Sequence, residues 1–97
     1  MSGKNQSLEQ IREKLRPVLE KHDVVKAEIF GSYARREQKD DSDIDILVEM
    51  ERGKTLVDIA DLKRELEEAT DKEVDILTYD SVNSEIRERI FSEAVEI

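Results

Sequence analysis

Two aspartates and a Gly-Ser pair have the residue types and the spacing that can bind a metal ion beside a phosphate. Asp43 and Asp45 stand two residues apart at the start of the apolar run 44–50. Side chains alternate along a strand, so two carboxylates at this spacing leave the same face. Gly31 and Ser32 directly follow the apolar run 24–30, and a turn of this kind presents backbone N–H groups to an anion. The pattern predicts an incomplete magnesium site next to a phosphate-binding turn, and therefore metal-assisted transfer from a nucleoside triphosphate.

The composition restricts the classes of protein that fit. The chain has 97 residues, which predicts a single small domain over residues 1–97. It has no cysteine, which excludes disulfides, thiolate nucleophiles and cysteine-ligated zinc. The formal net charge of -9 disfavours nucleic acid as a bulky substrate. Because residues 1–7 are polar and no apolar run has the length of a membrane helix, a soluble cytoplasmic protein is expected.

Capping residues and apolar spacing predict three of the helices. Ser7 and Gln10 form a capping box before the first helix, in which Pro17 is expected to introduce a kink, or a break that opens a second short turn. Thr55 is expected to cap a helix with an apolar stripe in which Lys63 is the one polar member, and Ser84 is expected to cap the last helix. The last helix is expected to bury one side, formed by Ile86, Ile90, Phe91, Ala94 and Ile97.

Three strands are predicted from apolar runs at 24–30, 44–50 and 74–77. A further short helix is predicted at 32–36, and its N-terminus points free N–H groups at an anion. Helices and strands thus alternate along the chain, beginning and ending with a helix. This order predicts a small α/β domain with a three-stranded mixed sheet packed with about four helices.

The combined motif resembles the signature of the DNA polymerase beta-like nucleotidyltransferase superfamily. The resemblance is carried by Gly31-Ser32, ten intervening residues and Asp43-x-Asp45. The runs Phe-Gly-Ser-Tyr-Ala-Arg at 30–35 and Asp-Ser-Asp-Ile-Asp-Ile-Leu-Val at 41–48 are most similar to its smallest branch. These are the minimal nucleotidyltransferase (MNT) domains, often called MntA-type antitoxins. The resemblance covers nearly the whole chain and implies the nucleotidyltransferase fold, also known as the polymerase beta-like palm.

The resemblance also implies a third carboxylate from a later strand, and Asp75 stands at the matching position. Asp75 lies between Val74 and Ile76, so its side chain leaves the opposite face of the strand from theirs. Glu73 and Asp71 are the nearby alternatives, but they precede the apolar run and are more typical of a solvated loop.

One residue departs from the pattern of the family. The motif commonly has Gly after its Arg, and this chain has Arg36 there. Either the short helix runs on without a turn at this point, or Arg36 adds a cation near the phosphates.

The reaction implied by the resemblance is Mg²⁺-dependent attack of a hydroxyl on the α-phosphorus of ATP, with pyrophosphate as the leaving group. Asp43, Asp45 and Asp75 are expected to hold the metal, and Asp75 to accept the proton of the hydroxyl. Gly31 and Ser32 are expected to cradle the β- and γ-phosphates. The local cations are Arg35, Arg36 and Lys39, of which Arg35 is favoured for the phosphate contact.

The resemblance further implies a partner. In this interpretation the chain is an antitoxin that transfers AMP to a tyrosine of a HEPN-domain ribonuclease toxin and thereby silences it. One alternative is a non-catalytic antitoxin that neutralises the toxin by binding alone, and another is nucleotidyl transfer to a small molecule. No direct nucleic-acid partner and no membrane association are expected.

Overall fold

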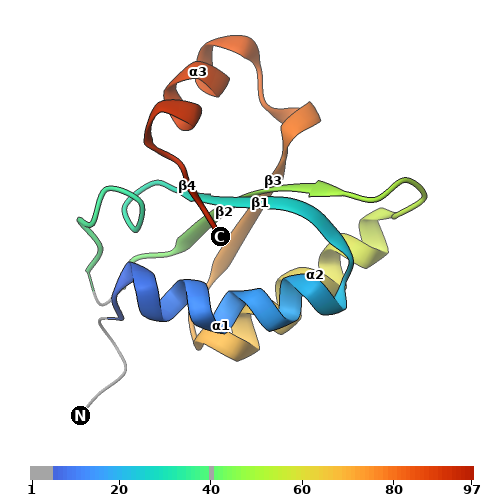
Figure 1. The fold of residues 1–97 in the computed structure, drawn as a ribbon, viewed down its shortest axis with the longest axis horizontal. Helices are drawn as coiled ribbons and strands as arrows, with labels where there is room; N and C mark the ends of the chain where they lie inside the picture. The colour runs from blue at the N-terminus through green and yellow to red at the C-terminus, as the bar shows by residue number, and fades with distance from the viewer. Residues whose placement is uncertain (1–5, 40) are drawn as a thin grey trace.

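The computed structural model describes residues 6–39 and 41–97, which form a four-stranded sheet with helices on both faces (Figure 1). In chain order the elements are α1 (Leu8–Lys21), β1 (Val24–Phe30), β2 (Ile44–Met50), α2 (Leu56–Thr70), β3 (Val74–Thr78), the 3₁₀ helix η1 (Tyr79–Ser81), α3 (Ser84–Glu93) and β4 (Val95–Glu96). The predicted α/β class and mixed sheet are confirmed. Two counts differ, because the described residues contain four strands in place of three, and three α-helices in place of about four.

The strand order in the sheet is β3-β2-β1-β4. β1 pairs antiparallel with both β2 and β4, whereas β2 and β3 run parallel. The parallel pair needs a crossover connection, and α2 supplies it. In Figure 1, α1 and α2 lie together on one side of the sheet and α3 lies on the other.

The larger core lies between the sheet and the α1–α2 pair. In β2, Ile44, Ile46 and Val48 are all fully buried, and they point to this face because they alternate along the strand. Leu62 and Leu66 of α2 belong to the same core. The intervening β2 residues, Asp45 and Leu47, therefore leave the opposite face. Sequence alternation thus determines which face receives the carboxylate.

The opposite face holds a smaller core. Leu47, Val82 and Ile90 are buried there, and Phe30 and Tyr79 pack against them. Since only Ile90 of α3 is buried, this helix covers the face incompletely. Ile86 and Phe91, which were predicted to be core residues, are about half exposed. Their prediction was wrong because a 10-residue helix over a small sheet has room to bury only one residue of its apolar side.

Two of the three predicted helix caps are confirmed. Ser7 and Thr55 each form a complete capping box with the residue three positions later. The third cap is one residue earlier than predicted, since the side chain of Asn83 accepts the N–H of Ile86 and Ser84 is already helical. Pro17 does not break α1, because an exposed proline removes a single N–H donor from an otherwise well-packed helix.

The last residues of the chain form a strand in place of the end of a helix. Ala94 has an extended conformation, and Val95 and Glu96 pair with Ile29 and Glu28 of β1. The N–H of Ile97 donates to the carbonyl of Ala27, which extends the pairing. The segment at 95–97, for which the sequence predicted a helix, thus pairs with the free edge of β1.

Within residues 6–39 and 41–97, no helix is both long enough and apolar enough to cross a lipid bilayer.

Asp71 ends α2 in the left-handed conformation (φ 59°), with its N–H bonded to the carbonyl of Glu67. Glycine adopts this conformation without steric cost, and a carboxylate at a helix C-terminus opposes the helix dipole. We therefore expect Asp71→Gly to raise the free energy of unfolding by about 0.5 to 1 kcal/mol in urea denaturation. Glu68→Gly, at an exposed position inside α2, is the control and should lower it by about 1 kcal/mol. Equal losses in both variants would contradict this explanation.

Candidate active site

Asp45 and Asp75 lie side by side on the face of the sheet that α3 covers incompletely. They are direct partners in the parallel ladder between β2 and β3. Their neighbours Ile44 and Val74 point to the core and are fully buried, so the two carboxylates share the other face. Asp43 lies just before β2 and is exposed. The structure thus brings together Asp45 and Asp75, although they are 30 residues apart in the chain, and Asp43 is close enough to raise the pKa of Asp45.

Gly31 lies against the carboxylate of Asp45. Its φ of +76° is in the left-handed region. A Cβ atom built at this position would be 2.3 Å from Oδ2 of Asp45. The register places Phe30 directly opposite Asp45, so the turn begins where the carboxylate stands. Glycine is therefore required at position 31 for two reasons. It adopts the left-handed backbone conformation, and it leaves room for the carboxylate of Asp45.

Asp43, Asp45 and Asp75 are called the acidic cluster below. The electrostatics of this cluster favour the binding of a cation. Burial raises the pKa of Asp45 to about 6, the carboxylates of Asp75 and Asp43 act in the same direction, and Arg35 acts against them. Negative charge at this place is thus only partly compensated by the protein itself. A divalent cation would remove the repulsion and shift Asp45 back to its charged form.

The donor set suits Mg²⁺ that is shared with a substrate. Carboxylate oxygens are the ligands that Mg²⁺ prefers. In the part of the chain that the structure describes, however, no group of three acidic, histidine or cysteine side chains is arranged to hold a metal ion by itself. Protein sites for Mg²⁺ commonly supply one or two carboxylates and leave the other positions to water and substrate phosphates. Asp45 and Asp75 fit that kind of site, with Asp43 at its edge.

Residues 31–36 form a tight turn, and the predicted short helix is absent. The N–H of Arg36 donates to the carbonyl of Tyr33, and the N–H of Glu37 donates to the carbonyl of Ser32. Together with the left-handed φ of Arg36 (59°), these bonds form a Schellman motif that limits the segment to a single turn, so no helix forms. The prediction failed because the stop signal is usually Gly, and here it is Arg36.

The structure supports neither of the two alternatives for Arg36. The turn is kept, with Arg36 in the conformation that Gly favours. Its guanidinium makes two hydrogen bonds to the carboxylate of Glu9, at 2.6 and 3.3 Å. The cation of Arg36 is thus directed to the start of α1 and does not join the acidic cluster.

The other two candidate cations differ in their surroundings. Arg35 donates to Glu93 at 2.8 Å and to Glu37 at 3.2 Å, and it is close enough to Asp45 to lower the pKa of that carboxyl. Lys39 is exposed, and its side chain forms no ion pair with the described residues. Of the three cations, Arg35 is therefore the one near the cluster.

A hollow beside the two carboxylates was not predicted from the sequence. Its lining comes from β1, β2, β3 and the first half of α2, and comprises Phe30, Asp45, Leu56, Ile59, Ala60, Lys63, Asp75, Ile76 and Leu77. Leu56 is 83% exposed, although it belongs to the apolar side of α2. One feature of the sequence indicated this hollow: Lys63 is a charged residue within the otherwise apolar side of α2. Lys63 brings a positive charge to the hollow and pairs with Glu67 at 3.6 Å.

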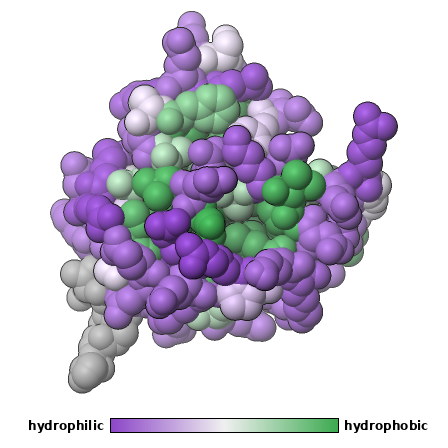
Figure 2. Space-filling model, viewed as in Figure 1, coloured by the Kyte–Doolittle hydropathy of each residue, from purple (hydrophilic) through white to green (hydrophobic). Residues whose placement is uncertain are grey.

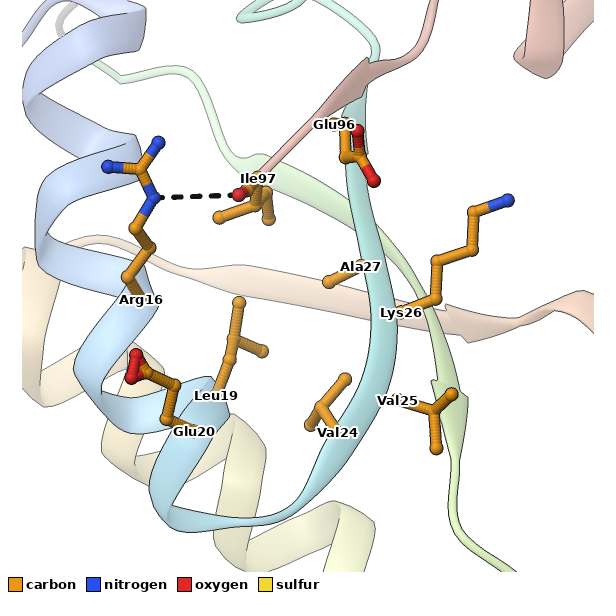
Figure 3. Close-up of a pocket in the computed structure, with 9 residues that line it drawn as sticks. All are labelled: Arg16, Leu19, Glu20, Val24, Val25, Lys26, Ala27, Glu96 and Ile97. Carbon is orange, nitrogen blue, oxygen red and sulfur yellow. Dashed lines mark hydrogen bonds between the residues drawn. The ribbon is translucent and has the colours of Figure 1, made fainter.

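A second hollow lies at the far end of β1, between α1, the start of that strand and the C-terminus (Figure 3). Figure 2 shows hydrophobic groups gathered in the middle of this side of the molecule, between α3 and α1, with hydrophilic groups around them. In the hollow, Arg16 donates to the backbone oxygen of Ile97, and the side-chain carboxylates are those of Glu20 and Glu96. None of the residues selected for chemistry lines it, so we assign the candidate site to the Asp45–Asp75 hollow.

Comparison with known proteins gives a consistent result. The family model for polymerase beta nucleotidyltransferases matches residues 13–97. The chain is 54% identical over 91 residues to MJ0435 of Methanocaldococcus jannaschii, which is named as a protein adenylyltransferase, and the match covers 94% of this chain and 98% of that protein. A solved structure of a minimal nucleotidyltransferase superposes with a TM-score of 0.84 at 36% identity, covering 96% of this chain and 98% of the other.

The fold also recurs in a toxin–antitoxin complex. A structure of a tri-AMPylated Shewanella oneidensis HEPN toxin with an MNT antitoxin matches with a TM-score of 0.70, covering 92% of this chain and 70% of that chain. At 20% identity this likeness concerns the fold alone.

Gly31→Ala should damage both stability and the site. The new methyl group meets Oδ2 of Asp45, and the left-handed backbone is strained as well. Gly53→Ala is the matched control, since Gly53 also has a positive φ (+91°) but has no atom within 4 Å of the added Cβ. We expect a loss of about 1 kcal/mol for Gly53→Ala and at least about 2 kcal/mol for Gly31→Ala in urea denaturation.

A second substitution tests the cause. Combining Gly31→Ala with Asp45→Ala removes the carboxylate that the methyl group meets, so the double variant should lose no more than Gly53→Ala. Strictly additive losses would show that the Gly31–Asp45 contact is unimportant.

Asp45→Asn should stabilise the metal-free protein at neutral pH. A carboxyl with a raised pKa destabilises the fold once it ionises, so the penalty is absent well below the ordinary value of 3.8 and complete above about 6. Because Asp45 is only half buried, solvent screening reduces the expected gain to about 1 kcal/mol. Urea denaturation with a chelator should show this gain at neutral pH and its loss at about pH 3. The control Asp80→Asn, an exposed carboxyl outside the cluster, should change little at either pH. A gain that does not depend on pH would contradict the charge explanation.

Proposed function

Because the chain belongs to the polymerase beta-like nucleotidyltransferase family, we propose that it is a Mg²⁺-dependent protein adenylyltransferase that acts as an antitoxin. It transfers AMP from ATP to a hydroxyl of a partner HEPN-domain ribonuclease toxin, and tyrosine is the proposed acceptor. Its proposed ligand set is Asp43, Asp45 and Asp75 for the metal, and Gly31, Ser32 and Arg35 for the phosphates. Arg36, which is directed to Glu9, is left out of this set.

The observation that carries the proposal is the pairing of Asp45 with Asp75 across the parallel strands, with the Gly31 turn against the same carboxylate. An unpaired acidic cluster of this kind costs stability, and a function explains why it is present. The cluster also opens into a hollow that could admit an acceptor side chain. The names of similar proteins support the same class of reaction.

The transfer joins the acceptor oxygen to the α-phosphorus and breaks the bond from that phosphorus to the bridging oxygen of the leaving pyrophosphate. Bound Mg²⁺ would supply charge neutralisation for the phosphates. Asp75 is exposed and reachable by the incoming hydroxyl, so it takes the proton. Ser32 follows Gly31 in the turn, and its hydroxyl would donate to a phosphate. Arg35 supplies positive charge on the same side of the cluster.

The proposed partner is consistent with the charge of the chain. A ribonuclease toxin needs a positive surface to hold RNA, and the antitoxin has a net charge of -9. AMP attached to a tyrosine of the toxin adds bulk and negative charge near that surface, which disfavours RNA. The HEPN toxin in the complex of the same fold is described as AMPylated.

The decisive experiment uses ATP labelled at the α-phosphate, Mg²⁺ and a HEPN protein encoded beside this chain. We expect label on the HEPN protein with the wild-type chain, and a loss of at least about 100-fold with the Asp43→Ala, Asp45→Ala double variant, because ligand removal abolishes charge neutralisation at the phosphates. A chelator should have the same effect on the wild type. The matched control is Asp61→Ala, Asp80→Ala, which changes the net charge equally away from the cluster.

Other outcomes lead to other functions. If both the wild type and the double variant inhibit the toxin and no label is transferred, the chain is an antitoxin that acts by binding and not an enzyme. Label on a small alcohol and none on protein would favour transfer to a small molecule.

A further inference from the structure

Arg35, the proposed phosphate ligand, is held by two carboxylates. Its Nη1 group donates to Glu93 at 2.8 Å, and its Nε group donates to Glu37 at 3.2 Å. Glu93 is the more buried of the two partners, with 27% of its side chain exposed against 66% for Glu37. The shorter and better shielded contact therefore links the phosphate-binding turn to the last residue of α3.

The local charge balance is unfavourable for a nucleotide. One guanidinium faces two carboxylates, so the group as a whole is negative where a triphosphate with several negative charges has to bind. A guanidinium makes strong hydrogen bonds to phosphate as well as to carboxylate. A partly exposed ion pair such as Arg35–Glu93 contributes little to stability, so a phosphate can displace Glu93.

We propose that Glu93 sets the affinity of the site for a nucleoside triphosphate by competing with the phosphates for the guanidinium of Arg35. This inference rests on the proposed function. Glu93 is a positioning residue, since it acts through Arg35. In the free protein it holds the guanidinium at α3, and in the bound protein the phosphates take its place.

The position of Glu93 gives this competition a wider effect. It joins α3 to β4, and α3 packs through a single buried residue, Ile90. Within the described residues, Arg35–Glu93 is the one ion pair between the turn and α3. Occupancy of the nucleotide site therefore releases one attachment of α3.

The test measures the dissociation constant of ATP with Mg²⁺ by calorimetry, without a partner protein. Glu93→Gln keeps the size of the side chain and removes its charge, so it should tighten binding about threefold to fivefold. Glu93→Asp keeps the charge and should return the affinity to within twofold of wild type. In an Arg35→Ala background, Glu93→Gln should have no effect on the affinity, which a change in folding or in general charge would not produce. Circular dichroism melting of each variant verifies the fold.

Glu88→Gln is the matched control, because Glu88 is an exposed carboxylate on the same helix and has no ion pair with a described residue. Unchanged or weaker binding in Glu93→Gln would overturn the inference, and so would equal tightening in Glu88→Gln or persistence of the effect without Arg35. Failure of the wild type to bind ATP would instead refute the proposed function, and this inference with it.

Discussion

The register between the parallel strands β2 and β3 is the constraint on which the site depends. It pairs Asp45 with Asp75 on one face because it pairs Ile44 with Val74 on the other. A slip of one residue would bury a carboxylate and expose an isoleucine. Burial of the apolar side chains against α1 and α2 therefore aligns the acidic pair. In this small domain the burial of apolar side chains both stabilises the fold and positions Asp45 beside Asp75.

The acidic cluster lowers the stability of the fold locally, and the packing of the rest of the domain compensates for this loss. Like charges are placed close together beside the partly buried carboxyl of Asp45, and among the described residues Arg35 opposes them. Arg35 is itself shared with carboxylates from the turn and from α3. Under the proposed function, joint binding of metal and nucleotide would neutralise the excess negative charge near Asp45 and give Arg35 a phosphate partner. Binding of either one should therefore favour binding of the other.

Local signals predicted the parts of the fold that depend on local structure. Strand alternation gave the face of Asp45, and the cap residues Ser7 and Thr55 gave the starts of α1 and α2. The sequence could not give β4, because the pairing of Val95 depends on a free edge of β1, far away in the chain. It also could not give the partners of Arg35, since Glu93 is 58 residues distant. Pairwise contacts between distant segments leave no periodic signal in a single sequence.

Two left-handed residues in one turn have different consequences for recognising distant members of this family. At Gly31 a side chain meets Asp45, so the position admits one residue type. At Arg36 the conformation is merely unfavourable, and an exposed arginine with a partner on α1 is accepted. A search pattern that demands glycine at both places would miss chains such as this one. Glycine at the first place, followed at the right distance by the paired aspartates, is the sounder criterion.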